Sequence, residues 1–460
     1  MMKKFIGDKA FYKRVLLIAL PMIAQNAITS FVSFLDNIMV GMIGTEQMSG
    51  VAIVNQLLFV FNLCIFGGVS GAGIFGTQFF GKGDYEGQKY AFRFKMYASA
   101  IIAGIALCLF CFWDTELIQL YLSDNGEIGN VEFALQYGRE YLAIMIIGLV
   151  PFALCQTYIS SIRETGHTFV PMMAGVAAML TNLVLDVLLI FGIGPIPAMG
   201  VKGAAVATVI ARVVECMIVL IWTHTHNKIN PYIVGAYKSF HIPKSILKEI
   251  LIKGSPLMIN EILWATSMAT IAQCYAVRGL EVVAAQNISS TITNLFNIVY
   301  IQLGSCIAII VGQYLGAGKL EEAKDANRKM IFFCVGCCTV VSILMIFVGR
   351  IFPNIYETEE FIKELARKFI VVSAAVMPIC AFSHCCYFTL RSGGRTGITF
   401  LFDSVCNWVL YIPVATFLAK YTTLPIVFVF FLVQFLELVK AIIGFFMVKS
   451  GTWVRNITEG

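Results

Sequence analysis

Charged side chains are scarce in this sequence, since Asp, Glu, Lys and Arg make up only 13% of its 460 residues. A soluble domain carries about a quarter. Hydrophobic residues reach 58% and the mean hydropathy is +0.82. This balance excludes an ordinary soluble protein and predicts a polytopic membrane protein. The net charge of +6 is not concentrated in a basic soluble domain, so we expect contact with membrane lipid and no nucleic-acid partner.

Histidine is scarce as well, and the cysteines are not arranged as metal ligands. None of the five histidines has H-x-x-x-H spacing, and the one close pair is His224 and His226. The 14 cysteines lie in or beside apolar segments, and the C-x-x-C of Cys334 and Cys337 has no second ligand pair at zinc spacing. These absences argue against a metal-dependent membrane enzyme, and we expect neither catalytic residues nor a cofactor.

Long apolar runs are what the sequence has in abundance. Runs of about twenty residues bounded by charges, Gly or Pro predict membrane-spanning helices, whereas barrel strands would appear as short alternating segments. We predict twelve spans, at residues 15–40, 50–80, 92–113, 135–162, 168–191, 201–223, 250–277, 284–315, 329–349, 369–390, 397–419 and 424–448. The predicted fold is therefore all-α and integral to the membrane.

The distribution of Lys and Arg predicts the orientation of these spans. Positively charged loops tend to stay in the cytoplasm. If the N-terminus is inside, most of the 33 Lys and Arg residues fall on the inner side, and only Arg212 and Lys440 lie well inside predicted spans, away from their ends. We therefore expect both termini in the cytoplasm of a multi-pass protein of the cell membrane.

An internal repeat organises the chain. The segment QFFGKGDYEGQK after the second span matches QYLGAGKLEEAK after the eighth, and Gln78 aligns with Gln313. The difference in residue number between matched positions is the same throughout the two segments. A second shared motif, R-x-x-G-x-T, begins at Arg163 after the fourth span and at Arg391 after the tenth. Matched motifs in both halves of the chain indicate a duplicated unit.

The duplicated unit has six spans, an even number, so both copies enter the membrane in the same orientation. Such a parallel repeat predicts two six-helix bundles related by an axis along the membrane normal. The predicted domains are an N-lobe, a cytoplasmic linker, a C-lobe and a cytoplasmic tail, at residues 1–223, 224–249, 250–448 and 449–460.

One carboxylate lies in the middle of the first span. An ionisable group at the bilayer centre costs about 3 kcal/mol even on lenient scales, so Asp36 should be paired, face a wet cavity or bind a ligand. Asp186 in the fifth span shares a helix face with Asn182, four residues earlier. Two carboxylates and an amide oxygen would offer hard ligands to a cation such as Na⁺, or a pair able to share a proton. The repeat counterpart of Asp36 is Ile271, which makes the charge specific to one half.

Other polar residues within spans receive more modest interpretations. Pairs three residues apart on one helix face neutralise each other, which we take as structural. We also treat Glu261 as a functional candidate, and we expect His384 to be a hydrogen-bonded interior residue. The structural pairs are Arg212 with Glu215 and Glu437 with Lys440.

Several of these segments together resemble one family. LPMIAQNAITSFVSFLDNIMVG, GTQFFGKGD, NLVLDVLLIFG, GVKGAAVAT, LRSGGRT and FLFDSVCNWVLYIPVA are similar to segments of the multidrug and toxic compound extrusion family of secondary transporters, and the resemblance covers essentially the whole chain. It implies a twelve-helix, two-lobe protein that alternates between inward-facing and outward-facing states. It also implies export of small organic compounds, often cationic and amphipathic, in exchange for Na⁺ or H⁺. We expect the chain to work as a monomer.

The resemblance also assigns roles to residues. The family's N-lobe cation site matches Asp36, Asn182, Asp186 and Thr208 of this sequence. Glu261 matches an acid of helix 7 that some members pair with an Asp of helix 10, but PICAFSHCCYFTLRSGG in the tenth span has no acid. The N-lobe site is therefore the predicted coupling site. Asp403 matches a position expected to have a structural or gating role.

Three other classes of function compete with an antiporter. A flippase for a lipid-linked oligosaccharide or a related amphiphile would need cations facing its cleft, and only Arg212 is available in mid-span. A membrane enzyme would need a nucleophile or a metal cluster. A receptor or channel would leave the parallel duplication unexplained.

Overall fold

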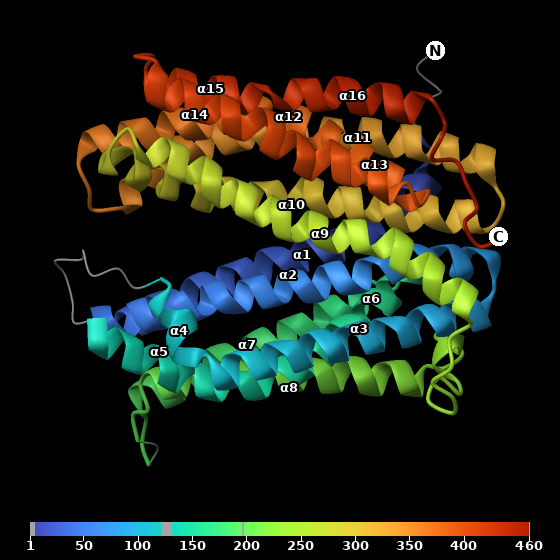
Figure 1. Ribbon diagram of the computed structural model, residues 1–460, viewed down its shortest axis with the longest axis horizontal. Coiled ribbons are helices and arrows are strands. Elements are labelled where there is room, and N and C mark those ends of the chain that lie inside the picture. The colour runs from blue at the N-terminus through green and yellow to red at the C-terminus, as the bar shows by residue number, and fades with distance from the viewer. Residues whose placement is uncertain (1–4, 122–130, 196, 460) are drawn as a thin grey trace. The chain divides into compact units, whose positions relative to one another are not determined.

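The computed structural model describes residues 5–121, 131–195 and 197–459, which are helical apart from their connections (Figure 1). Segments labelled η are short 3₁₀ or π helices. The elements are α1 (Lys9–Gly41), α2 (Thr45–Lys82), α3 (Tyr85–Phe112), α4 (Asp114–Gln119), α5 (Val131–Met145), η2 (Ile146–Gly148), α6 (Leu149–Glu164), α7 (Phe169–Phe191), α8 (Val201–Thr225), η3 (Pro231–Ile233), α9 (Lys244–Ala276), α10 (Leu280–Gly316), α11 (Leu320–Ile351), η4 (Phe352–Ile355), α12 (Glu360–Ser392), α13 (Thr396–Phe400), η5 (Leu401–Val405), η6 (Asn407–Tyr411), α14 (Ile412–Tyr421), α15 (Ile426–Phe435) and α16 (Glu437–Lys449).

All twelve predicted spans lie on helices, which confirms the all-α prediction. Among the described residues, eleven helical stretches are long and apolar enough to cross a membrane. The seventh predicted span lies on α9, which is helical over 33 residues but carries charges at its start and at Glu261. The fourth span is built from α5, η2 and α6, and the eleventh runs from α13 to α14 through two π-helical turns, η5 and η6.

The repeated motifs are helix stops with the same geometry in both copies. Gly83 and Gly318 have φ values of 78° and 72°, which favour glycine. In each copy the amide that follows this glycine bonds a carbonyl five residues back, over 2.9 and 3.0 Å. Gly166 and Gly394 of the R-x-x-G-x-T motifs end α6 and α12 in the same way, with φ of 86° and 72°. The sequence repeat is therefore a repeat of helix C-caps.

The contacts divide the chain into two compact units. Unit 1 comprises Met1–Ile23, Thr77–Asp84 and Leu251–Gly460, so it includes the start of α1 and the end of α2. Within it, α12 packs against α10, α11 and α16. Its core contains Cys306, Ile310 and Met345, each with no exposed surface.

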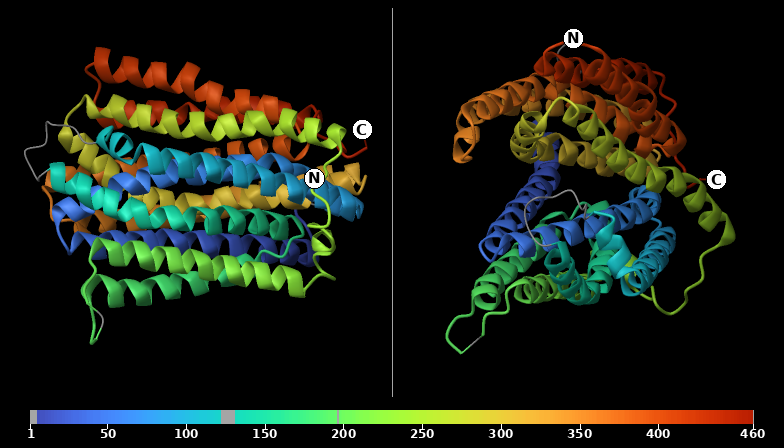
Figure 2. Two further views of the ribbon diagram at one scale, coloured as in Figure 1. Left: turned by 60° about the horizontal axis from the view of Figure 1, so that its bottom comes forward. Right: turned by 60° about the vertical axis from the view of Figure 1, so that its left-hand side comes forward.

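Unit 2 comprises Ala24–Gly76 and Tyr85–Ile250. Here α7 packs against α8, and α6 packs against α3 and α8, and Figure 2 shows these helices running side by side. A side chain on Gly203 of α8 would place its Cβ 2.5 Å from the carbonyl oxygen of Leu189 on α7. Glycine at this position therefore permits the close approach of the two helices.

The segment between α8 and α9 packs onto unit 2. Tyr232 has no exposed surface, and Arg93 of α3 donates hydrogen bonds to three carbonyls of this segment. These carbonyls belong to Ala236, His241 and Gly235, at 2.8, 3.0 and 3.3 Å. The segment is thus fixed to the helices and is more than a flexible tether.

Candidate functional site

The centre of unit 2 brings together three of the predicted residues. The carboxyl groups of Asp36 on α1 and Asp186 on α7 lie within hydrogen-bonding reach of each other, and Asn182 lies within reach of Asp186. Asp186 and Asn182 are only 1% and 4% exposed, and Asp36 is half-buried. The four-residue spacing on α7 places Asn182 and Asp186 on one helix face, as predicted from the sequence.

These polar atoms lack correctly oriented hydrogen-bond partners. In the described part of the chain, Oδ1 of Asp36, both carboxylate oxygens of Asp186 and both amide heteroatoms of Asn182 are buried and form no hydrogen bond. Two carboxylates have only acceptors to offer each other when both are ionised. Burying them unpaired is costly, so a cation between them or a proton shared by them is needed for stability.

The donor set consists of oxygen ligands, which suit a hard cation or a proton. Carboxylate and amide oxygens are ligands for hard cations, whereas the nitrogen and sulfur ligands preferred by zinc are missing from this cluster. Among the described residues, no group of three or more His, Cys, Asp and Glu has an arrangement that would hold a metal ion. Carboxylate and amide oxygens can bind a hard cation or exchange a proton.

Thr208 contributes less directly than predicted. Its hydroxyl donates to the carbonyl of Ala204 on the same helix, over 3.0 Å, and lies within reach of the hydroxyl of Tyr141. Tyr141 on α5 is 4% exposed and feels the charges of Asp36 and Asp186. Its hydroxyl also donates to Oδ1 of Asn55 on α2, at 3.4 Å. Tyr141 therefore lies beside Thr208 and near enough to the carboxylate pair to feel its charge.

Sequence reasoning missed Tyr141 and Asn55. A tyrosine inside an apolar span has the same sequence signature whether it faces lipid or the interior, so nothing distinguished Tyr141. Asn55 in the second span did carry a signal, since an amide within an apolar run needs a partner. Its partner lies 86 residues away in the sequence.

Arg212 belongs to a wider charge cluster than the predicted pair with Glu215. Glu215 interacts with Arg163 as well as with Arg212. Arg163 donates to Oε1 of Gln25 on α1, over 2.7 Å. The guanidinium of Arg212 lies over the ring of Phe152 at 5.0 Å, which is cation–π geometry. Glu215 therefore interacts with Arg212, as predicted, and serves Arg163 as a second cation.

Glu261 lies in unit 1, apart in the chain from the other predicted residues. It interacts electrostatically with Arg391 on α12 and with Asp403 on η5. Asp403 in turn accepts a hydrogen bond from Nδ2 of Asn260 at 3.2 Å and from Lys440 at 2.9 Å. Glu261 therefore faces one arginine and one acid, and no acid from α12.

The predicted ion pair of Glu437 with Lys440 is present, and Lys440 has a second, closer partner. Lys440 is 3.8 Å from Glu437 but only 2.9 Å from Asp403, so its main partner is the acid of the eleventh span. Glu437 accepts a hydrogen bond from the hydroxyl of Tyr411, at 2.7 Å. His384 is an interior residue, as expected, with its ring edge-on to Tyr300 at a centroid distance of 4.8 Å.

Comparison with known proteins identifies related sequences and structures. A family model described as MatE matches residues 21–188 and 256–417, once in each half of the repeat. A probable multidrug resistance protein NorM of Thermotoga maritima is 23% identical over 416 residues, which cover 89% of this chain and 86% of the relative. Another protein with the same name from Bacillus subtilis is 22% identical over 430 residues, covering 92% of each.

Solved structures share the fold over nearly the whole chain. A crystal structure of MATE in complex with MaD3S has a TM-score of 0.86 and 19% identity, covering 98% of this chain and 97% of the other. A structure described as an outward-facing conformation of a multidrug resistance MATE family transporter of the MOP superfamily has a TM-score of 0.84, also at 19% identity and with the same coverage. These likenesses establish the architecture of two repeated six-helix halves.

Proposed function

Because this chain belongs to the MatE family of membrane transporters, we propose that it exports small organic compounds, often cationic and amphipathic, by antiport with Na⁺ or H⁺. As a member of this family the chain is a transporter and not an enzyme. The observation that carries the antiport proposal is the pair of carboxylates Asp36 and Asp186, in which Oδ1 of Asp36 and both oxygens of Asp186 are buried without a hydrogen bond in the described part of the chain. A bound cation or proton removes the repulsion between the two carboxylates, and this repulsion returns when the cation leaves. The pair therefore responds strongly to whether a cation is bound.

The chain's own residues divide the work of coupling. Asp36 and Asp186 supply the negative charge, and Asn182 adds a neutral oxygen on the same face of α7. Tyr141 on α5 and Thr208 on α8 lie near the pair and contribute polar hydroxyl groups to its surroundings. Because these groups come from different helices, occupancy by a cation stabilises one arrangement of the helices more than another.

Coupling to transport then follows from differential affinity. A ligand shifts an equilibrium between access states only by the difference in its affinity for them. If the cation prefers one facing direction and the organic substrate prefers the other, downhill entry of one drives export of the other. One charge moving through 100 mV supplies about 2.3 kcal/mol.

The competing flippase function gains no support from the one mid-span arginine. Arg212 lies over Phe152 and shares Glu215 with Arg163. Its Nη1 is buried and its charge is balanced by Glu215, which does not favour binding of a pyrophosphate. We therefore favour organic compounds as substrates.

We further propose that the chain works as a monomer in the cell membrane with both termini in the cytoplasm. The excess of Lys and Arg in the predicted inner segments supports this orientation. The relatives' names support the class of substrate, since both are called multidrug resistance proteins.

The test is efflux of ethidium, a fluorescent organic cation, from cells that express the protein, with Na⁺ and pH gradients imposed separately. Asp36→Asn and Asp186→Asn should each slow efflux by at least about tenfold, which matches a coupling free energy of 1–3 kcal/mol. Glu281→Gln changes an exposed carboxylate at the start of α10 and should leave efflux unchanged. Normal export by Asp36→Asn under both gradients would refute the proposal.

A further inference from the structure

The segment that follows α16 is held in unit 1 by a buried tryptophan and by several hydrogen bonds. We call residues 451–459 the strap. Trp453 is only 2% exposed, and its indole nitrogen donates to the carbonyl of Val448, over 2.9 Å. The strap therefore begins with a buried anchor and continues across the surface of unit 1.

The first copy of the Q-x-x-G-x-G motif holds the far end of the strap. Gln78 has no exposed surface, and its Oε1 accepts a hydrogen bond from the backbone amide of Ile457 at 2.9 Å. Its Nε2 donates to the carbonyls of Ser392 and Arg455, at 2.9 and 3.3 Å. Lys82 of the same motif donates to the carbonyl of Thr458, at 3.1 Å.

The strap also contacts the other repeated loops of unit 1. Asn456 donates to the carbonyl of Gly316 in the second Q-x-x-G-x-G motif, at 3.3 Å. Arg395 of the second R-x-x-G-x-T motif donates to the carbonyl of Thr452, at 3.1 Å. The strap thus joins three loops that the sequence repeat had singled out.

Gly393 gives the strap its closest backbone contact. A Cβ built on this residue would lie 1.8 Å from the carbonyl oxygen of Trp453. Its own φ is −86°, which any residue adopts, so only the approach of the strap requires glycine here. The neighbouring Gly397 on α13 offers a comparison, since a Cβ there would meet nothing within 4 Å.

Beneath the strap, the two copies of the motif touch each other reciprocally. A Cβ on Gly81 would lie 2.1 Å from the carbonyl oxygen of Gln313, and one on Gly316 would lie 1.9 Å from that of Gln78. Only glycine fits at the first glycine position of each motif, because the end of α2 packs directly against the end of α10 there.

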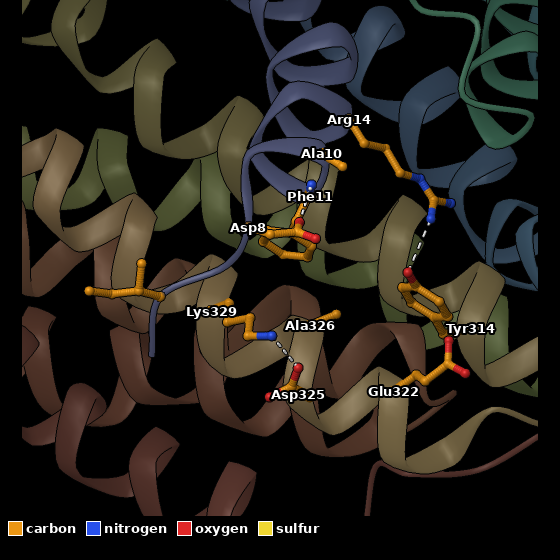
Figure 3. Close-up of a pocket in the computed structure, with 10 residues that line it drawn as sticks. Asp8, Ala10, Phe11, Arg14, Tyr314, Glu322, Asp325, Ala326 and Lys329 are labelled. Atoms are coloured by element: carbon orange, nitrogen blue, oxygen red, sulfur yellow. Dashed lines mark hydrogen bonds and ion pairs between the residues drawn. The ribbon is translucent and has the colours of Figure 1, made fainter. Parts of the chain in front are cut away.

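The two equivalent glutamines hold different segments. Gln313 accepts a hydrogen bond from Arg14 of α1 at 2.7 Å, and Figure 3 shows the same arginine reaching Tyr314. Gln78 holds the strap instead. The two copies of the motif therefore differ in their partners, since Gln313 binds α1 whereas Gln78 binds the strap that follows the last helix.

We propose that the strap is a releasable latch that keeps the end of α2, residues 77–84, bound to the second half of the chain in one access state. This inference rests on the proposed function, because a latch has a purpose only in a protein that alternates between states. Residues 77–84 come from the first half of the repeat, yet the hydrogen bonds of Gln78 and Lys82 described above go to the second half and the strap. Release of the strap frees this end of α2 to move.

The test measures amide hydrogen exchange of the strap and of residues 77–84 by mass spectrometry, with the full chain in lipid nanodiscs. An exporter takes up its substrate from the cytoplasmic side, where the strap is expected to lie. Addition of ethidium should therefore speed exchange of both segments in the wild-type protein by at least about tenfold, a change typical of local opening. A fixed structural clip would exchange at the same rate with and without ethidium.

Gly393→Ala should displace the carbonyl of Trp453, so exchange of the strap and of 77–84 should be fast already without ethidium. Gly397→Ala is the matched control and should behave as wild type. Gln78→Leu provides a second route to release if Gly393→Ala does not fold.

Efflux of ethidium by the wild type and by Asp36→Asn, measured in parallel, separates the two proposals. If the wild type exports ethidium but the exchange rate of the strap does not change when ethidium is added, the latch is overturned and the transport function stands. Absence of wild-type efflux, or normal efflux by Asp36→Asn, would overturn the proposed function and with it the role of the latch.

Discussion

Nζ of Lys440 on α16 donates a hydrogen bond to Oδ1 of Asp403 on η5, over 2.9 Å. Their side chains are 7% and 16% exposed, and the pair joins two helices of the second half of the chain. Asp403 lies on a π-helical turn, a local irregularity that is frequent at functional sites and that here directs the carboxylate toward the lysine.

Lys440→Met should destabilise the protein strongly. The substitution leaves Asp403 and Glu437 buried without their cation, and removing one partner of a buried ion pair costs about 3–5 kcal/mol. Thermal unfolding in detergent measures the effect. The double variant Lys440→Met with Asp403→Asn should recover part of the loss. Lys368→Met, which breaks an exposed pair with Glu364, should have little effect. A stable single variant with an unchanged melting temperature would contradict a structural role for the pair.

Gly203→Ala should destabilise unit 2, because the new methyl group would lie 2.5 Å from the carbonyl oxygen of Leu189. Overpacking of this kind costs about 1–3 kcal/mol. The matched control is Gly104→Ala within α3, where a Cβ meets nothing within 4 Å. That control should raise stability by about 0.5–1 kcal/mol, since alanine is the better helix former. Thermal midpoints of the two variants should therefore move in opposite directions, and a shift of the same sign in both would show that the α7–α8 contact does not depend on glycine.

Arg93→Gln should release the segment between α8 and α9 from the helices. The arginine satisfies three carbonyls of residues 235–241, and a glutamine side chain is too short to replace all three bonds. Amide exchange and trypsin cleavage at Lys238 should both become faster. Lys228→Gln alters an exposed residue of the same segment and serves as the control. Unchanged protection in Arg93→Gln would mean that the buried Tyr232 holds the segment alone.

Acid should destabilise the loop between α6 and α7 through His167. Burial lowers the pKa of this histidine below its ordinary value of 6.5, so the folded protein favours the neutral ring. The unfolded chain binds the proton first as the pH falls through 6.5, and stability is lost progressively below that pH. His167→Gln should reduce the loss of melting temperature between pH 7 and pH 5. The exposed His241→Gln variant should retain the wild-type pH profile. Identical pH profiles for His167→Gln and wild type would contradict this assignment.

Much of the fold was predictable because its signals are local. Each apolar run is a property of adjacent residues, and the lipid environment permits few structures other than helices for runs of this length. The helix stops at Gly83 and Gly318 were visible in the sequence as a repeated motif. Their left-handed backbone conformation is known only from the structure. On α7, the spacing of Asn182 and Asp186 fixed their common face through helix periodicity alone.

What only the tertiary structure decided is which polar groups meet across helices. Neither the Tyr141 to Asn55 contact nor the closer pairing of Lys440 with Asp403 follows from spacing, because the partners come from different helices brought together by packing. The strap is a further case, since nothing in residues 451–459 marks them as ligands of Gln78. By itself the sequence determined the helices, the duplication and the presence of charges that lipid does not tolerate. Tertiary packing chose the partners of those charges, because helices that are apolar on many faces can associate in several ways and only their three-dimensional arrangement selects one.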